Sequence, residues 1–236
     1  MGFFSAISTG IGTIASLGSS ICSGLAIASS KLGGVIGCAL GGFSKMIAMI
    51  PDPETIELTI KIISAVVKGI GEALGLINNK EEVEELGAKA LQAEEKPEDF
   101  DSIEEYIEYL KNEVELDQEK FNNISKEEKL TCSAIGSTIL AKGISEKKGI
   151  DVSIEFLADI GKLNLKAKEV EAYIDNFKSN SLDLNLGDYL KGNLTASENL
   201  NIRPIVLDTI KELNPTFSDK ESKEKLGEMK MLLNEK

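Results

Sequence analysis

Apolar residues recur at helical spacing along most of the chain, and the most regular run begins after Pro51. Six positions there repeat at steps of four and three residues, which places them on one side of a helix as a heptad seam. We call them the association seam: Ile56, Ile60, Ile63, Val67, Ile70 and Leu74. Asp52 suits an N-cap and Pro53 a first helical position, so we predict a helix from about Pro53 to Ile77.

The seam has two interpretations. Heptads with apolar positions on one side are typical of coiled coils, so the helix is a candidate for self-association, with Glu57 and Lys61 on its wet side. The same stripe also suits a helix packed inside its own bundle. Both interpretations stay open, because three heptads are few. We expect this helix to be the longest in the first half of the chain.

Before Pro51 the pattern changes, because the first 50 residues contain only two charged side chains, Lys31 and Lys45. Small residues recur there at every fourth position, in two sets. We call them the small-residue ridge: Ser8, Gly12, Ser16, Ser20, Gly24, Gly33, Gly37 and Gly41. Such a ridge lets another backbone approach closely, as in tightly packed membrane helices. Large apolar residues share one helical side at Ile7, Ile11, Ile14, Ile21, Leu25 and Leu32.

The uncharged run from Phe3 to Ser30 exceeds the roughly 20 apolar residues that span a bilayer. Gly33 and Gly34 mark a bend, so we expect a helical hairpin with arms near residues 3–29 and 34–50. The apolar surface of this hairpin must be buried by lipid, in the core of a homo-oligomer, or against a different protein. The absence of a positive n-region and the length of the run argue against a cleavable signal peptide. N-terminal myristoylation is also disfavoured, because Ala6 stands where that motif has Ser or Thr.

The remaining chain is predicted to be an acidic bundle of helices. Capping boxes start three of them, at Ser102, Ser125 and Ser218, each with Glu three residues later. Further helices are expected over 80–95, 126 to about 142 with Gly143 as its end, 151–160 and 165–178, and from Pro204 onward. The alternation of Leu182, Leu184 and Leu186 indicates either a short strand or a loop. We predict an all-α protein with seven to nine helices.

Charge and composition narrow the function. The net charge is −13, and residues 1–51 contribute +2, so the rest carries −15. This balance argues against nucleic acid as a partner and against docking of the acidic part on anionic lipid. Histidine is absent, and the three cysteines show no metal spacing. No phosphate loop, dinucleotide fingerprint or nucleophile elbow occurs. We therefore expect no enzyme and no catalytic, cofactor or metal site.

Three segments follow: an apolar membrane- or assembly-buried segment over 1–51, the heptad helix over 52–79, and an acidic helical domain over 80–236. In layout alone the chain is similar to phage tail or ejection components, injection-machine cargo and pore-forming secreted proteins. We expect a structural, membrane- or particle-associated component that inserts residues 1–50 into lipid or an assembly core. The alternative is a homo-oligomeric scaffold or adaptor with the hairpin as its core. A carboxylate-based or oxygen-bound-metal enzyme is the third hypothesis.

Overall fold

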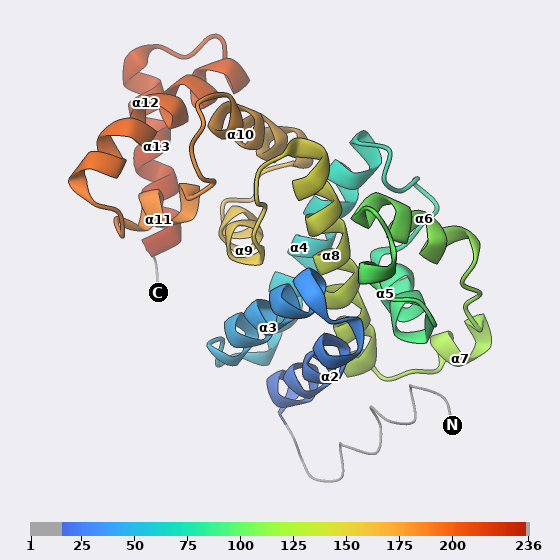
Figure 1. The fold of residues 1–236 in the computed structure, drawn as a ribbon. Helices are drawn as coiled ribbons and strands as arrows, with labels where there is room; N and C mark the ends of the chain where they lie inside the picture. Colours follow the sequence, from blue (N-terminus) through green and yellow to red (C-terminus); the bar gives the residue numbers. More distant parts are fainter. Residues whose placement is uncertain (1–15, 235–236) are drawn as a thin grey trace. The chain divides into compact units, whose positions relative to one another are not determined.

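The protein is all-α in the computed structural model, which describes residues 16–234 (Figure 1). Within these residues there is no strand, and the predicted all-α class is confirmed. Twelve α-helices lie in this range, more than the predicted seven to nine. The difference arises from short helices such as Gln118–Asn122 (α7) and Leu186–Lys191 (α11), which are too short to show a periodic stripe. The chain divides into two compact units, residues 1–147 and 148–236.

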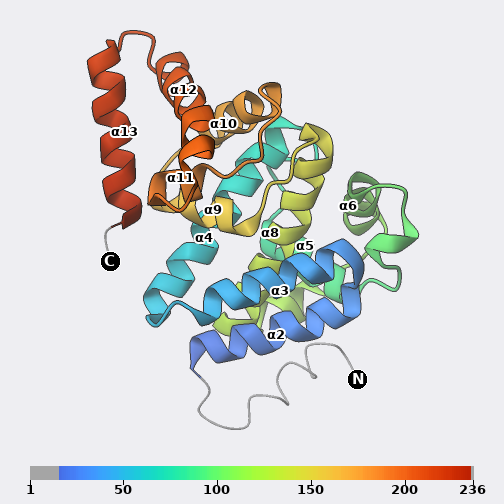
Figure 2. The same ribbon diagram turned by 60° about the vertical axis from the view of Figure 1, so that its left-hand side comes forward.

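The first unit contains seven of the described α-helices and one 3₁₀ turn. They are α2 (Leu17–Leu32), α3 (Gly34–Ala48), α4 (Pro53–Ala73), α5 (Val83–Gln92), η1 (Pro97–Asp99), α6 (Ile103–Asn112), α7 (Gln118–Asn122) and α8 (Lys126–Lys148). Figures 1 and 2 show α8 between α4 and α5. The core of the unit includes fully buried side chains from α4, α5, α6 and α8: Ile60, Ile63, Leu91, Ile107 and Ile139.

Helix α8 is the centre of this unit. From Leu130 to Ile144 every residue except Ser133 and Lys142 is buried. A helix covered on all sides has no single apolar stripe, so its sequence pattern understates its role. The predicted end at Gly143 is wrong, because the helix continues to Lys148. Gly143 serves packing instead: an added Cβ atom would lie 2.9 Å from Ile107 Cδ1 of α6.

Helices α5 and α8 approach each other so closely that their backbones touch. A Cβ atom on Gly136 would lie 1.9 Å from the carbonyl oxygen of Val83, and one on Gly87 would lie 2.0 Å from that of Cys132. Real Cβ atoms do not come so near, so both positions require glycine. This crossing fixes the helix that carries the central core.

The predicted caps at Asp52, Ser125 and Ser218 are present. At Ser102 only half of the predicted box forms: the Ser102 hydroxyl accepts from the Glu105 N–H, but the Glu105 carboxylate accepts from the N–H of Asp101 instead of Ser102. Asp52 Oδ2 accepts a hydrogen bond from the Thr55 N–H at 2.7 Å, with Pro53 in the first turn. Ser125 and Ser218 form the reciprocal capping bonds with Glu128 and Glu221. Within the described residues of the first half, α4 is the longest helix, as predicted, but it ends at Ala73 rather than Ile77. Gly75 has a φ of +72°, which turns the chain out of the helix.

The second unit consists of α9 (Ile154–Lys162), α10 (Ala167–Ser179), α11 (Leu186–Lys191), α12 (Ala196–Leu213) and α13 (Asp219–Asn234). Leu182 and Leu184 lie in a loop before α11, so the strand alternative is wrong. Pro204 does not begin a helix as predicted but lies inside α12. Proline there removes the N–H that would bond the carbonyl of Leu200. Leu200 is 74% exposed, so water can bond this carbonyl.

Candidate functional site

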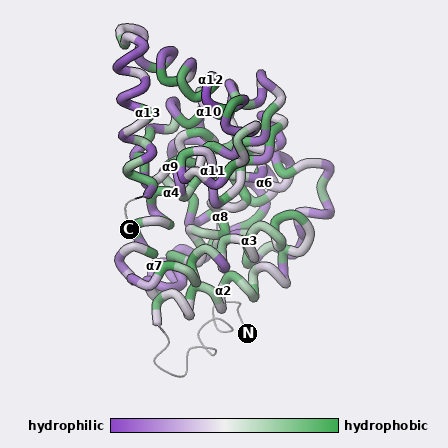
Figure 3. The backbone as a smooth tube through the Cα atoms, turned by 90° about the vertical axis from the view of Figure 1, so that its left-hand side faces the viewer, coloured by the Kyte–Doolittle hydropathy of each residue, from purple (hydrophilic) through white to green (hydrophobic). Residues whose placement is uncertain are grey.

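Among the described helices, α2 and α3 contain the fewest charged residues, and we take this helix pair as the candidate site. Figure 2 shows the two helices side by side, and Figure 3 shows little hydrophilic colour along them. Residues 17–48 contain Lys31 and Lys45 as their only charged side chains. Among residues 16–234, none of the helices has both the length and the apolar character that crossing a membrane requires.

The turn between the two helices depends on glycine. Gly33 and Gly34 have φ values of +64° and +46°, a region that residues with a Cβ atom rarely adopt. The Gly33 N–H donates to the carbonyl of Ser29 at 3.0 Å and so closes the end of α2. Gly34 is the first residue of α3, so the chain reverses within two residues.

The contact between α2 and α3 is close and partly polar. A Cβ atom at Gly37 would lie 2.6 Å from the backbone oxygen of Ser29, so only glycine permits this approach. The Ser29 hydroxyl donates to the carbonyl of Gly37 at 2.7 Å. Nearer the open end of the pair, the Cys22 thiol donates to the carbonyl of Ser44 at 3.3 Å. The two helices therefore hold each other through contacts that belong to the pair alone.

Most large apolar side chains of the pair are buried in the first unit, whereas Ile27 and Val35 are exposed. Each of the buried ones is at most 1% exposed: Ile21, Leu25, Leu32, Ile36, Leu40, Phe43 and Ile47. Gly24 lies against α8, where an added Cβ atom would be 2.7 Å from Thr131 Cγ2. Gly18 lies against α4, where an added Cβ atom would be 3.1 Å from Ile56 Cδ1. This cover by the chain's own helices is a fourth possibility, beside the lipid, oligomer and partner protein considered from sequence.

The structure separates the members of the small-residue ridge. Gly24 and Gly37 lie at close contacts, and Ser20 is buried. Ser16 is the N-cap of α2 and accepts a bond from the Ser19 N–H. Gly33 belongs to the turn, and a Cβ atom on Gly41 would meet nothing within 4 Å. Ser8 and Gly12, with Ile7, Ile11 and Ile14, lie outside the described residues.

The tip of the pair is attached to α5 and η1 by two polar side chains. The Lys31 ammonium donates to the carbonyl of Leu91, the last turn of α5, and its partial burial lowers the pKa of Lys31. The carboxylate of Glu98 lies against the Gly33–Gly34 turn: a Cβ atom on Gly34 would be 2.4 Å from Glu98 Oε1, so the turn leaves room for this group. A carboxylate near the start of α3 also suits the positive end of the helix dipole.

The association seam is covered inside the chain. Ile56, Ile60, Ile63, Val67 and Ile70 are at most 2% exposed, whereas Leu74 is half-buried at the C-cap. Gly18 of α2 lies near Ile56 of the seam. Beside the seam, the hydroxyl of Ser64 on α4 is 2.8 Å from the hydroxyl of Ser137 on α8. A second copy would reach the seam only after these helices move apart, so its role in association stays a prediction.

The described residues offer little chemistry elsewhere. Within 16–234, no group of three Cys, Asp or Glu side chains is arranged to hold a metal ion. Burial raises the pKa of the Cys132 thiol to about 12, which makes it a poor nucleophile. In the second unit, Asp159 pairs with Lys191 at 2.6 Å beside Gly187, where there is no room for a Cβ atom. This pair fixes α9 to α11.

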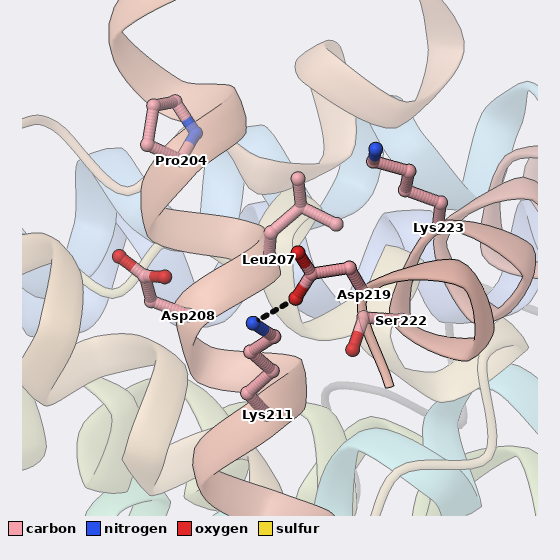
Figure 4. A pocket seen from close by; sticks show the side chains of 7 residues that line it. All are labelled: Pro204, Leu207, Asp208, Lys211, Asp219, Ser222 and Lys223. Atoms are coloured by element: carbon pink, nitrogen blue, oxygen red, sulfur yellow. Dashed lines mark hydrogen bonds and ion pairs between the residues drawn. The ribbon is translucent and has the colours of Figure 1, made fainter. Parts of the chain in front are cut away.

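A small hollow in the second unit lies between α12 and α13 (Figure 4). Its volume is about 160 Å³, and Pro204 and Leu207 form its apolar wall. Charges of both signs surround it, with Lys211 paired to Asp219. The mixed charge selects no class of ligand.

Comparison with known proteins identifies no relative: the chain matches no family, no curated protein and no solved structure.

Proposed function

We propose that this protein is a non-enzymatic structural component or cargo of a membrane-interacting assembly, of the phage tail, ejection, injection-machine or pore-forming kind. In this proposal, residues 1–50 form an apolar helical hairpin that is stored against the helical body and then enters lipid or the core of the assembly. The observation that carries the proposal is the Ser29–Gly37 contact, because it joins α2 to α3 without any residue of the body.

A pair that satisfies its own close packing can leave the body as one piece. Helices bond their backbone groups internally, which an apolar environment demands. Apart from Ser20, the buried side chains of α2 and α3 are apolar, so lipid or an apolar groove can replace the body at small cost. The polar attachments known at the tip, Lys31 to Leu91 and Glu98 at Gly34, lie at the edge and can exchange with water.

The dimensions limit the form of entry. With a rise of 1.5 Å per residue, the 16 residues of α2 extend about 24 Å, less than the roughly 30 Å of a bilayer core. The proposal is therefore entry of the pair as a unit into one leaflet or an assembly groove.

A disulfide across the Gly24–Thr131 contact tests the release step. A Cβ atom on Gly24 would lie 3.5 Å from Thr131 Cβ, within the range of about 3.5–4.5 Å found in disulfides. We would introduce Gly24→Cys and Thr131→Cys after changing Cys22, Cys38 and Cys132 to alanine. The oxidised protein should neither sediment with vesicles nor release an entrapped dye, and a reductant should restore both activities.

A second disulfide provides the matched control. The hydroxyls of Ser64 on α4 and Ser137 on α8 are 2.8 Å apart. A disulfide between Ser64→Cys and Ser137→Cys would therefore join α4 to α8 and leave α2 free to move. This variant should act on vesicles in both redox states. Equal activity of the oxidised and reduced Gly24–Thr131 lock would show that the pair does not leave the body, and the proposal would be abandoned. The proposal would also be abandoned if the cysteine-free protein neither bound vesicles nor released their dye.

The alternative function is a homo-oligomeric scaffold, favoured by the outer face of the pair. This face is exposed and uncharged along α2, with Ser19, Ser23, Ala26, Ile27 and Ser30. On a chain with net charge −13, such a face is where two copies meet with the least repulsion. A discrete oligomer by mass measurement without detergent, unchanged by the Gly24–Thr131 lock, would favour this alternative.

A further inference from the structure

The first unit contains a cavity at the base of the α2–α3 pair. Its volume is about 470 Å³, and it lies where the start of α2, the end of α3 and the start of α4 meet. None of the lining residues carries a charge, and they include Ser16, Cys22, Ile47, Ile50, Pro53 and Ile56. The volume falls within the range of about 300–1,000 Å³ that is typical of binding pockets. Its wall is uncharged and mostly apolar, which suits apolar side chains or acyl chains rather than ions.

We propose that this cavity is the docking site for residues 1–15 of the same chain. These residues contain no Asp, Glu, Lys or Arg, and their large side chains are apolar: Phe3, Phe4, Ile7, Ile11 and Ile14. A segment without charged side chains and with large apolar ones matches an uncharged, mostly apolar wall. The inference concerns the stored protein and holds whether or not the pair enters lipid.

The point of attachment supports this occupant. Ser16, which joins residues 1–15 to α2, itself lines the cavity. Its φ and ψ of −62° and 153° are extended, so the chain leaves the axis of α2 at this residue. An extended chain covers about 3.3–3.6 Å per residue, so Ile11 and Ile14 reach the cavity easily.

The tether also decides between the segment and competing occupants. A segment joined to the rim of its site has an effective concentration on the order of millimolar. A separate lipid or a second copy that binds the cavity with the same intrinsic affinity must exceed that concentration to displace it. Burial of a single large apolar side chain favours the docked over the undocked segment by a factor on the order of ten or more.

Cys22 provides a native reporter for this docking, because it lines the cavity. Cys38 is exposed and Cys132 is buried, so the same chain supplies a fast and a slow reference thiol. We would measure the rate at which each cysteine reacts with a small thiol reagent. In the full chain, Cys22 should react about tenfold or more slowly than in a chain that lacks residues 2–15.

Two point variants test the same contact in the full-length chain. Ile11→Asp with Ile14→Asp should speed the reaction of Cys22 about as much as the deletion, because charged side chains do not enter a mostly apolar cavity. Ser8→Asp with Thr9→Asp adds the same charge without removing an apolar side chain, and should leave Cys22 protected. In every variant the reactivities of Cys38 and Cys132 should be unchanged, which reports that the fold is intact.

The other occupants give different results. Protection that rises with protein concentration would mean that a second copy fills the cavity. Protection that appears only after phosphatidylcholine vesicles are added would mean that lipid fills it. Either result, or equal reactivity of Cys22 in all the variants, would overturn the inference. None of these results decides the lipid-release proposal, which the Gly24–Thr131 lock tests separately.

Discussion

Gly24 of α2 and Thr131 of α8 meet at the point where the apolar helix pair joins the centre of the first unit. A Cβ atom on Gly24 would lie 2.7 Å from Thr131 Cγ2 and 3.1 Å from its Oγ1. The two residues are more than 100 positions apart in the sequence. A single missing side chain thus sets the distance between the pair and the helix that supports it.

Gly24→Ala should destabilise the protein by about 1–3 kcal/mol, the usual cost of overfilling a packed core. In a Thr131→Ala background the same change should be neutral or stabilising, because the remaining Cβ–Cβ distance of 3.5 Å is ordinary contact. Gly41→Ala is the control: with nothing within 4 Å, it should stabilise by about 0.5–1 kcal/mol. Chemical denaturation of the four variants gives the coupling. Additive effects at Gly24 and Thr131 would contradict the contact.

Gly136→Ala should be more damaging than Gly24→Ala, by about 1 kcal/mol or more. The obstacle at Gly136 is the backbone oxygen of Val83, which cannot rotate away as a side chain can. Gly87→Ala should behave alike, since it meets the carbonyl of Cys132. Thermal unfolding compares these variants with Gly227→Ala, where nothing lies within 4 Å. Equal melting temperatures for Gly136→Ala and Gly227→Ala would refute the backbone contact of α5 and α8.

Ile63→Asp should unfold the first unit rather than only dissociate a complex. Ile63 is fully buried within the chain, and an unpaired carboxylate there should cost about 3 kcal/mol or more. Leu58→Asp is the matched control on the same helix, and its 58% exposure predicts an almost unchanged stability. Circular dichroism and mass measurement distinguish the outcomes. A folded Ile63→Asp monomer, beside an oligomeric parent, would assign the seam to association instead.

The cap at Asp52 predicts a pH dependence. Hydrogen bonds from Thr55 hold the pKa of this carboxyl below its usual value of 3.8. A carboxyl with a lowered pKa in the folded state stabilises fully above its unfolded pKa, and this contribution is lost as the pH falls through the folded value. The stability difference between the parent and Asp52→Ala should therefore shrink below about pH 4. A difference that is constant from pH 7 to pH 2.5 would contradict this assignment.

Much of the first unit could be predicted from local sequence signals. The Asp52 and Pro53 cap and the seam spacing gave the start and the buried face of α4, because both depend on neighbours within a few residues. The reversal at Gly33 and Gly34 has an equally local cause. The ridge was harder to interpret: Gly24 and Gly37 have the same spacing as Gly41, yet only the first two meet another backbone or side chain. Spacing cannot tell which side of a helix has a neighbour.

The central role of α8 could not be predicted, because it depends on contacts from distant parts of the chain. Gly143 looked like the end of a helix, and its actual function becomes visible only when α6 is packed against it. Pro204 misled in the same way, since proline favours the start of a helix but is tolerated where water can bond the carbonyl that it leaves. The one sequence signal for the buried position of α8 was the run of small residues at Gly136, Ser137 and Thr138.

The position of α8 also has a consequence for how the protein is made. Helix α3 ends at Ala48 and α8 ends at Lys148, so roughly 100 residues separate the apolar pair from the helix that supports it. At about 5–20 residues per second, translation leaves an interval of roughly 5–20 seconds between the two. During this time the buried face of α2 and α3 has no α8 to contact. Newly made chains should therefore depend on a chaperone, or on an early destination for the pair, until α8 is complete.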